Sequence, residues 1–159
     1  MAVRLLALAP LMMTTLLIAS AVGAESDPGV GVGAQSDPAV GVWQVYSDKN
    51  DGSSNGLVRT YVQDGKLVGV VDALPPDAPP NPTCTKCSGT QKDKPVLGLV
   101  IMWGFEKEGD SWTGGTILEP QTGTTYKCKV HFAPPDSLKV RGYVGVPLFG
   151  RSQTWKRVR

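Results

Sequence analysis

The strict alternation of apolar and polar side chains between residues 124 and 132 constrains the fold more than any other feature of this sequence. The apolar members of the pattern are Tyr126, Cys128, Val130 and Phe132, and the polar members are Thr125, Lys127, Lys129 and His131. Successive side chains of a strand point to opposite faces, so a period of two indicates a half-buried antiparallel strand. Residues 138–144 alternate in the same way. The chain therefore contains strands with one face toward a core.

Strand patterns separated by turn signals continue through the rest of the chain. We expect strands at residues 42–47, 57–63, 66–74, 96–105, 111–118, 124–132, 138–144 and 152–158. The apolar run 96–105 fits a buried strand, although periodicity alone does not separate this from a helix. The 19 Gly and 13 Pro residues punctuate short strands and disfavour helix interiors. Because closure removes exposed strand edges, we predict an all-β, antiparallel up-and-down barrel of about eight strands.

The N-terminus predicts export. Arg4 is followed by an apolar run and then by small residues through Ala24, which is the order of a secretory signal peptide. Cleavage after Ala21 and cleavage after Ala24 both satisfy the small-x-small rule, and an uncleaved membrane anchor is disfavoured by Pro10 within the apolar run. We predict a signal peptide at residues 1–24, a flexible leader with a direct repeat at 25–40, and a barrel domain at 41–159. The periplasm is the expected compartment.

The charge balance limits the partners. The chain has 16 Lys+Arg and 14 Asp+Glu, and loss of Arg4 leaves 15 against 14. A nearly neutral protein lacks the concentrated basic surface that nucleic acid requires, so we expect no nucleic-acid partner. Charged side chains at the outward positions of residues 127–141 also disfavour an outer-membrane barrel, whose outer band is apolar. We therefore expect a chain that does not span the membrane after signal cleavage.

Seven short motifs together resemble a bacterial family, domain of unknown function 2147. They are GVW at 41–43, NPTCTKC at 81–87, GLVI at 98–101, WTGGTIL at 112–118, TGTTY at 122–126, LKVRGY at 138–143 and GRSQTW at 150–155. The resemblance covers residues 41–157 and departs conservatively at Glu119, where Asp is expected before Pro120. It implies an exported, uncharacterised protein with a lipocalin-like barrel.

The same resemblance implies a structural seal at one end of the barrel. Lipocalins open with Gly-x-Trp, here Gly41 and Trp43, and a basic residue of the last strand lies over that Trp. Arg157 is the first candidate for this residue and Arg141 the second. A guanidinium on an indole face contributes about 0.5–2 kcal/mol. We assign the set a structural role, separate from any functional site.

Three cysteines leave several pairings open in an oxidising compartment. Cys84 and Cys87 are the disulfide candidates, with Cys128 buried and free. Alternatively, one of them pairs with Cys128 and pins the long loop to the sheet. A zinc site that adds His131 is disfavoured, because Cys128 and His131 point to opposite faces of one strand. A thioredoxin-like redox role is disfavoured because the CxxC lies in a loop and not at a helix N-terminus.

No catalytic constellation is evident in the sequence. The GSSNG segment at 52–56 matches a nucleophile-elbow pattern but lies in a polar hairpin loop. The acidic residues at 106–110 surround a turn, as solvated carboxylates ordinarily do, and those at 48–51 do not fit the spacing of a calcium loop. We therefore assign no catalytic residue, expect neither a metal nor a cofactor, and expect a non-enzymatic protein.

A binding role follows by elimination, because a barrel mouth is a usual site for an apolar ligand. Alternation nominates as lining residues Val45, Tyr61, Leu67, Val100, Met102, Trp112, Tyr126 and Val130. The expected ligand is a small, mostly apolar molecule. Two alternatives stay open: a barrel with a solid core that docks an envelope protein through its loops, and an enzyme.

Overall fold

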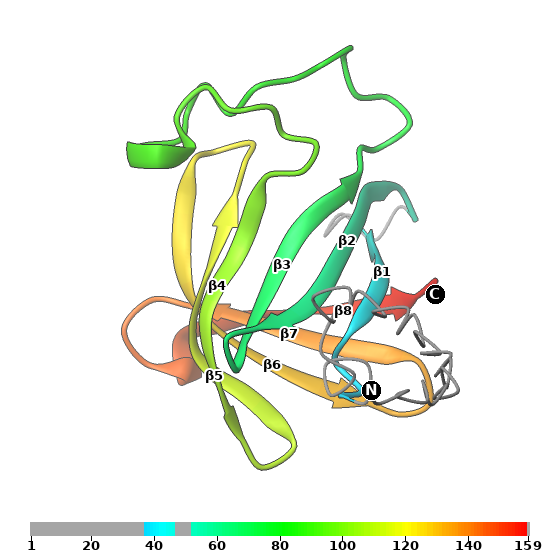
Figure 1. Cartoon of the computed structure of the whole chain (residues 1–159), viewed down its shortest axis with the longest axis vertical. Coiled ribbons are helices and arrows are strands. Elements are labelled where there is room, and N and C mark those ends of the chain that lie inside the picture. The colour runs from blue at the N-terminus through cyan, green and yellow to red at the C-terminus, as the bar shows by residue number, and fades with distance from the viewer. Residues whose placement is uncertain (1–36, 47–51, 159) are drawn as a thin grey trace, which may run out of the picture.

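The computed structural model describes residues 37–46 and 52–158, and these form a closed eight-stranded antiparallel barrel (Figure 1). The strands are β1 (Gly41–Tyr46), β2 (Ser54–Gln63), β3 (Lys66–Ala73), β4 (Val100–Glu108), β5 (Ser111–Glu119), β6 (Thr124–Ala133), β7 (Ser137–Tyr143) and β8 (Gly150–Arg157). The described part also holds two short 3-10 turns, η1 (Gly89–Gln91) and η2 (Pro147–Phe149). Each strand pairs with the next, and β8 closes on β1 through the Trp43–Arg157 pair. The predicted up-and-down barrel is confirmed.

The two ends of the barrel differ in their connections. At one end, called here the turn end, tight turns join β2 to β3, β4 to β5 and β6 to β7. At the other, called here the loop end, residues 74–99, 120–123 and 144–149 connect the strands. Figure 1 shows the long 74–99 loop in green above β3 and β4, with the β4–β5 hairpin at the bottom of the view. Long connections at one end leave room for a mouth there.

The interior of the turn end is solid. Leu67, Met102, Phe105 and Val130 are completely buried, and Trp112 is nearly so. Two glycines make room for the largest of these side chains. A Cβ on Gly69 would lie 2.8 Å from the Met102 sulfur, and one on Gly115 would overlap the Phe105 ring. Close packing of this kind leaves no room for a ligand in the turn half of the barrel.

The predicted starts of β4 and β2 differ most from the observed ones, and β4 also ends later than predicted, at Glu108. β4 begins at Val100 and not at residue 96, because the backbone of residues 96–99 bonds elsewhere: Val96 N–H donates to Pro82 and Gly98 N–H to Val71. Gly98 has φ +79°, a left-handed conformation that suits glycine and interrupts a strand. β2 begins at Ser54 and not at residue 57, so residues 54–56 of the predicted polar loop belong to the strand.

The last four residues of the predicted leader are in contact with the barrel. Residues 37–40, called here the strap, pack against the turn end, and Ala39 is buried. The Thr60 hydroxyl donates to the Ala39 carbonyl over 2.5 Å, which ties the strap to β2. The predicted signal peptide and the first part of the leader lie outside the described residues. Within 37–46 and 52–158, no helix has the length and hydropathy needed to cross a bilayer.

Candidate ligand cavity

A cavity of about 370 Å³ opens at the loop end of the barrel. Its apolar wall consists of Val45, Leu57, Val58, Val71, Leu74, Pro75, Val96, Ile101, Ile117, Leu118, Pro120, Val140, Val144, Phe149 and Trp155. The polar side chains around it are Asn55, Glu119, Gln121, Tyr126, Tyr143, Arg151 and Gln153. Exposed rim residues such as Val144 and Phe149 show that the cavity reaches the surface. Ligand pockets in proteins commonly measure about 300–1,000 Å³, so this one suits a small molecule.

Polar side chains reach the cavity from several strands, and two of them come from β8. Arg151 and Gln153 occupy alternate positions of β8, opposite Gly142 and Val140 of β7. Facing residues of an antiparallel pair share a face, so all four point toward the interior. The Gln153 carboxamide oxygen accepts a hydrogen bond from the Trp155 indole over 3.1 Å. A largely apolar chamber with a few polar groups in its wall can orient a ligand that has one polar end.

Two of the eight nominated lining residues lie on this wall: Val45 and Tyr126. The other six do not, and they correct the prediction in two ways. Leu67, Met102, Trp112 and Val130 point into the barrel but lie in its solid half, because alternation gives the face of a strand and not the depth along the barrel axis.

Tyr61 and Val100 were assigned to the wrong face. On β2 the fully buried residue is Thr60, which points inward although it is polar. Its hydroxyl accepts a hydrogen bond from the Trp43 indole and donates one to the Ala39 carbonyl. Tyr61, the next residue, therefore points outward. On β4 the cavity is lined by Ile101. The β3–β4 pairing shifts register between Gly69 and Val70, which breaks the simple alternation there.

The sequence analysis also missed residues that build the mouth. Val140 and Trp155 follow the inward positions of their strands, so alternation could have found them. Val144 and Phe149 come from the β7–β8 loop, and no periodic pattern indicates which way a loop folds. Arg151 is the second residue of β8 and lies before residue 152, where the predicted strand began.

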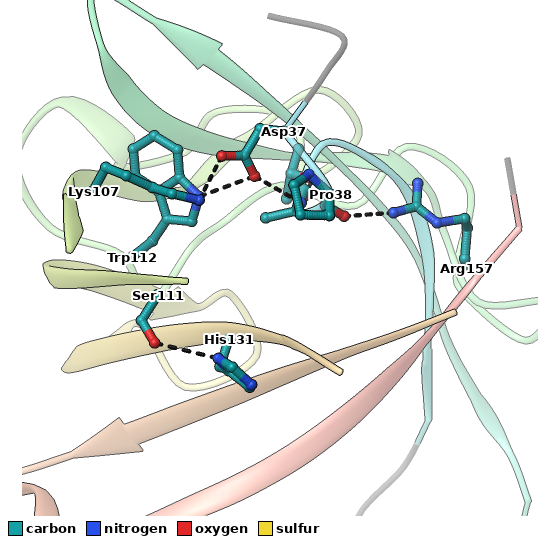
Figure 2. Close-up of polar contacts among 9 residues, drawn as sticks. Asp37, Pro38, Lys107, Ser111, Trp112, His131 and Arg157 are labelled. Atoms are coloured by element: carbon teal, nitrogen blue, oxygen red, sulfur yellow. Dashed lines mark hydrogen bonds and ion pairs between the residues drawn. The ribbon is translucent and has the colours of Figure 1, made fainter. Parts of the chain in front are cut away.

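The predicted seal lies at the turn end, away from the cavity. The Arg157 guanidinium carbon lies 4.2 Å from the centre of the Trp43 ring, and Trp43 is completely buried. Arg157 also donates to the Pro38 carbonyl over 2.5 Å (Figure 2) and to the Val40 carbonyl over 2.9 Å. The stacked residue is thus Arg157 and not the second candidate, Arg141, and Gly41 opens β1 beside Thr60.

Asp37 anchors the far end of the strap (Figure 2). Its carboxylate lies 2.6 Å from the Lys107 amine and accepts a hydrogen bond from the Trp112 indole over 3.3 Å. Burial alone would raise the pKa of Asp37, but hydrogen bonds from Lys107, the Ala39 backbone and Trp112 outweigh it and lower that pKa. The strap is therefore fixed by charge at Asp37 and by the Arg157 guanidinium at Pro38 and Val40.

The long loop at the mouth carries the disulfide. Cys84 and Cys87 are joined to each other, and Cys128 is a free, buried thiol. This is the first of the alternative pairings. Burial raises the pKa of Cys128 to about 12, which keeps the thiol protonated and unreactive. Disulfides are typical of proteins in oxidising compartments.

Within the described part of the chain, the other sequence motifs considered as possible active-site or metal-binding groups lie apart from the cavity or have a structural role. The Ser54 hydroxyl of the elbow-like segment accepts hydrogen bonds from Gln44 and from the Gly56 backbone, so it fixes the start of β2. Ser111 and His131 lie 3.3 Å apart on the outer surface, away from the cavity (Figure 2). Among residues 37–46 and 52–158, no three His, Cys, Asp or Glu side chains gather as metal ligands would. The acidic segment 48–51 lies outside the described residues.

Comparison with known proteins identifies the family. The model of a family described as "Uncharacterized protein conserved in bacteria (DUF2147)" matches residues 41–157. The chain belongs to this family. The match spans the barrel from the first residue of β1 to the last residue of β8, so the DUF2147 domain and the barrel coincide.

A solved structure supports the fold. Protein HP1028 from the human pathogen Helicobacter pylori, described as belonging to the lipocalin family, is similar to this chain with a TM-score of 0.65 and 19% identity. The similarity covers 76% of this chain and 82% of that one. This DUF2147 barrel is thus lipocalin-like. A search of curated proteins gives no match.

Proposed function

We propose that this protein is exported to the periplasm and binds a small, mostly apolar molecule in the cavity at the loop end of its barrel. The observation that carries the proposal is the cavity itself: about 370 Å³, walled by aliphatic and aromatic side chains, with a few polar groups such as Arg151 and Gln153. A lipocalin-like barrel closed by packing at its turn end is suited to hold one ligand at its other end. The proposed role is binding and not catalysis.

The export part of the proposal rests on the signal-peptide pattern and on the Cys84–Cys87 disulfide, which suits an oxidising compartment. N-terminal sequencing of the protein recovered from the envelope should begin at Val22 or Glu25. A soluble cytoplasmic protein that retains Met1 would contradict it.

The binding part is tested by filling the cavity from one position. Gly142 points inward between Ile117 and Tyr126, and a Cβ there would meet these side chains at ordinary distances of 3.8 and 3.6 Å. Gly142→Leu should therefore place its side chain in the ligand space with little strain. Titration with an apolar naphthylamine fluorophore, which brightens in an apolar site, should show binding to the wild type. Binding to Gly142→Leu should be at least about tenfold weaker, since a ligand group worth about 1.4 kcal/mol or more is displaced.

Thr154→Leu is the matched control, because Thr154 is exposed on the same sheet and faces outward. It adds the same side chain outside the cavity and should bind the fluorophore as the wild type does. Gly142→Ala, which adds one methyl group, should weaken binding by a smaller amount. Equal binding by the wild type and Gly142→Leu would contradict the site, and no binding by the wild type would favour the alternative of a docking module without a ligand.

A further inference from the structure

The β7–β8 loop exposes four large apolar side chains beside the cavity mouth. Val144, Val146, Leu148 and Phe149 are 71%, 52%, 79% and 77% exposed. They are called here the apolar rim. Monomeric proteins seldom expose so many apolar groups together unless the surface meets a membrane or a protein. In Figure 1 this loop, orange, projects from the barrel at the left of the view.

The loop is held in this position by the barrel. Arg141, which lies on the outer face of β7, donates from Nε to the Pro147 carbonyl over 2.8 Å and from Nη2 to the Leu148 carbonyl over 3.3 Å. Its Nη1 donates to the Ser152 hydroxyl over 2.8 Å. One guanidinium thus satisfies the loop carbonyls and leaves the apolar side chains directed away from the barrel.

The outer face beside this loop is basic. Lys127, Lys129 and Lys139 are exposed and project from the same face as Arg141, since Lys129 pairs directly with Arg141 and Lys127 pairs with Tyr143. These three lysines are called here the basic face. None of the residues of β6, β7 and β8 is acidic. Within the described part of the chain, none of the three amines forms an ion pair.

We propose that the apolar rim and the basic face together dock this protein on an anionic lipid surface. The apolar side chains would enter the interface between headgroups and acyl chains, and the lysines would lie against the anionic headgroups. A protruding loop with uncharged tips suits shallow insertion into lipid, and the one-signed charge beside it complements anionic lipid. Docking would turn the cavity mouth toward the membrane.

Co-sedimentation with lipid vesicles tests the docking. The full chain as recovered from expressing cells should bind phosphatidylcholine vesicles that contain phosphatidylglycerol, bind pure phosphatidylcholine weakly, and lose affinity as salt is raised. The double variant Leu148→Ser/Phe149→Ser should bind at least about tenfold more weakly, because two apolar anchors are lost. The triple variant Lys127→Gln/Lys129→Gln/Lys139→Gln should also bind at least about tenfold more weakly, but to anionic vesicles only.

Two matched controls keep the test specific. Val158→Ser removes an apolar side chain that is 50% exposed at the turn end, and Lys66→Gln removes an exposed positive charge beside the β2–β3 turn at the same end. Both should bind vesicles within about twofold of the wild type, as expected for surface changes away from a site. Phe149→Trp should show a blue-shifted emission on anionic vesicles.

Three results would overturn the proposal: no co-sedimentation, equal losses in the controls and the test variants, or concentration-dependent self-association that Leu148→Ser/Phe149→Ser abolishes. The last result would assign the apolar rim to a second copy of the chain. Fluorophore binding is measured without vesicles, so a failure of the cavity and a failure of docking are separate outcomes.

Discussion

Replacement of Arg157 by methionine should destabilise the barrel by about 2–4 kcal/mol. The variant keeps the apolar stem of the side chain and removes the guanidinium. The contact with the Trp43 ring, at 4.2 Å, contributes about 0.5–2 kcal/mol. The bond to the half-buried Val40 carbonyl contributes about 1.5 kcal/mol or more, because a charged donor is lost there. The bond to Pro38 is exposed and adds little, since water can replace it.

A double-mutant cycle separates the stacking from the hydrogen bonds. Trp43→Leu removes the ring, and its combination with Arg157→Met should show a coupling of at least about 0.5 kcal/mol. Urea unfolding followed by circular dichroism gives the four free energies of unfolding. Arg157→Lys should destabilise less than Arg157→Met, because an ammonium keeps the charge but does not stack as a planar guanidinium does.

Arg59→Met is the control for this cycle. Arg59 is an exposed arginine that pairs with Asp72 at 3.1 Å. Arg59→Met should lower the free energy of unfolding by no more than about 1 kcal/mol, and its effect should be additive with that of Trp43→Leu. If Trp43→Leu and Arg157→Met are also additive, the two side chains are not in energetic contact. The stacking contact that forms the seal would then be refuted.

Three further predictions concern other parts of the barrel. Asp37 has a lowered pKa in the folded state, so its ionised carboxylate stabilises the fold above its ordinary pKa of about 4. This stabilisation is lost as the pH falls through the lowered pKa. The free energy of unfolding of Asp37→Asn should therefore fall less steeply below about pH 4 than that of the wild type. Cys128, with a pKa of about 12, should not react with a thiol reagent at pH 8 in the native protein, and unfolding without reductant should expose one thiol, at Cys128. Gly115→Ala should cost about 1–3 kcal/mol, because its methyl group would overlap the Phe105 ring, whereas Gly142→Ala should cost less than about 1 kcal/mol; thermal unfolding of both variants checks this contrast.

Sequence alone predicted the barrel because its strands obey one simple rule. On β6 the outward positions carry Lys127, Lys129 and His131, and the inward positions Cys128 and Val130 are buried as expected. In an antiparallel strand with one face in solvent, the alternation of polar and apolar residues indicates which face is buried. The Gly and Pro residues between the strands indicated the turns, and these two signals together predicted the fold class.

The rule failed where backbone bonds decide the structure. The apolar run 96–99 has the composition of a buried strand, but its amides pair with Pro82 and Val71, and it becomes the end of the long loop. The strap was predicted to be part of the flexible leader, residues 25–40, which contains a direct repeat. Its order comes from long-range contacts with Lys107 and Arg157, which lie far away in the sequence.

The cavity was harder to predict than the barrel around it. Alternation identifies the inward face of a strand, and Val45 and Tyr126 were found in this way. It does not indicate how far along the axis the core is filled, which depends on pairs such as Gly69 with Met102 and Gly115 with Phe105. The distribution of glycines opposite large side chains decides which half is solid, and it becomes visible only when the register is known.

Native mass spectrometry of the protein purified from its own envelope tests the central claim most directly. The wild-type barrel should carry a single small molecule, seen as one defined mass increment over the polypeptide and released on unfolding. Gly142→Leu, purified in the same way, should show the polypeptide mass alone, while Thr154→Leu should retain the increment. If the wild type carries no small molecule under conditions that preserve the fold, or if Gly142→Leu carries the same one, the cavity at the loop end is not a ligand site.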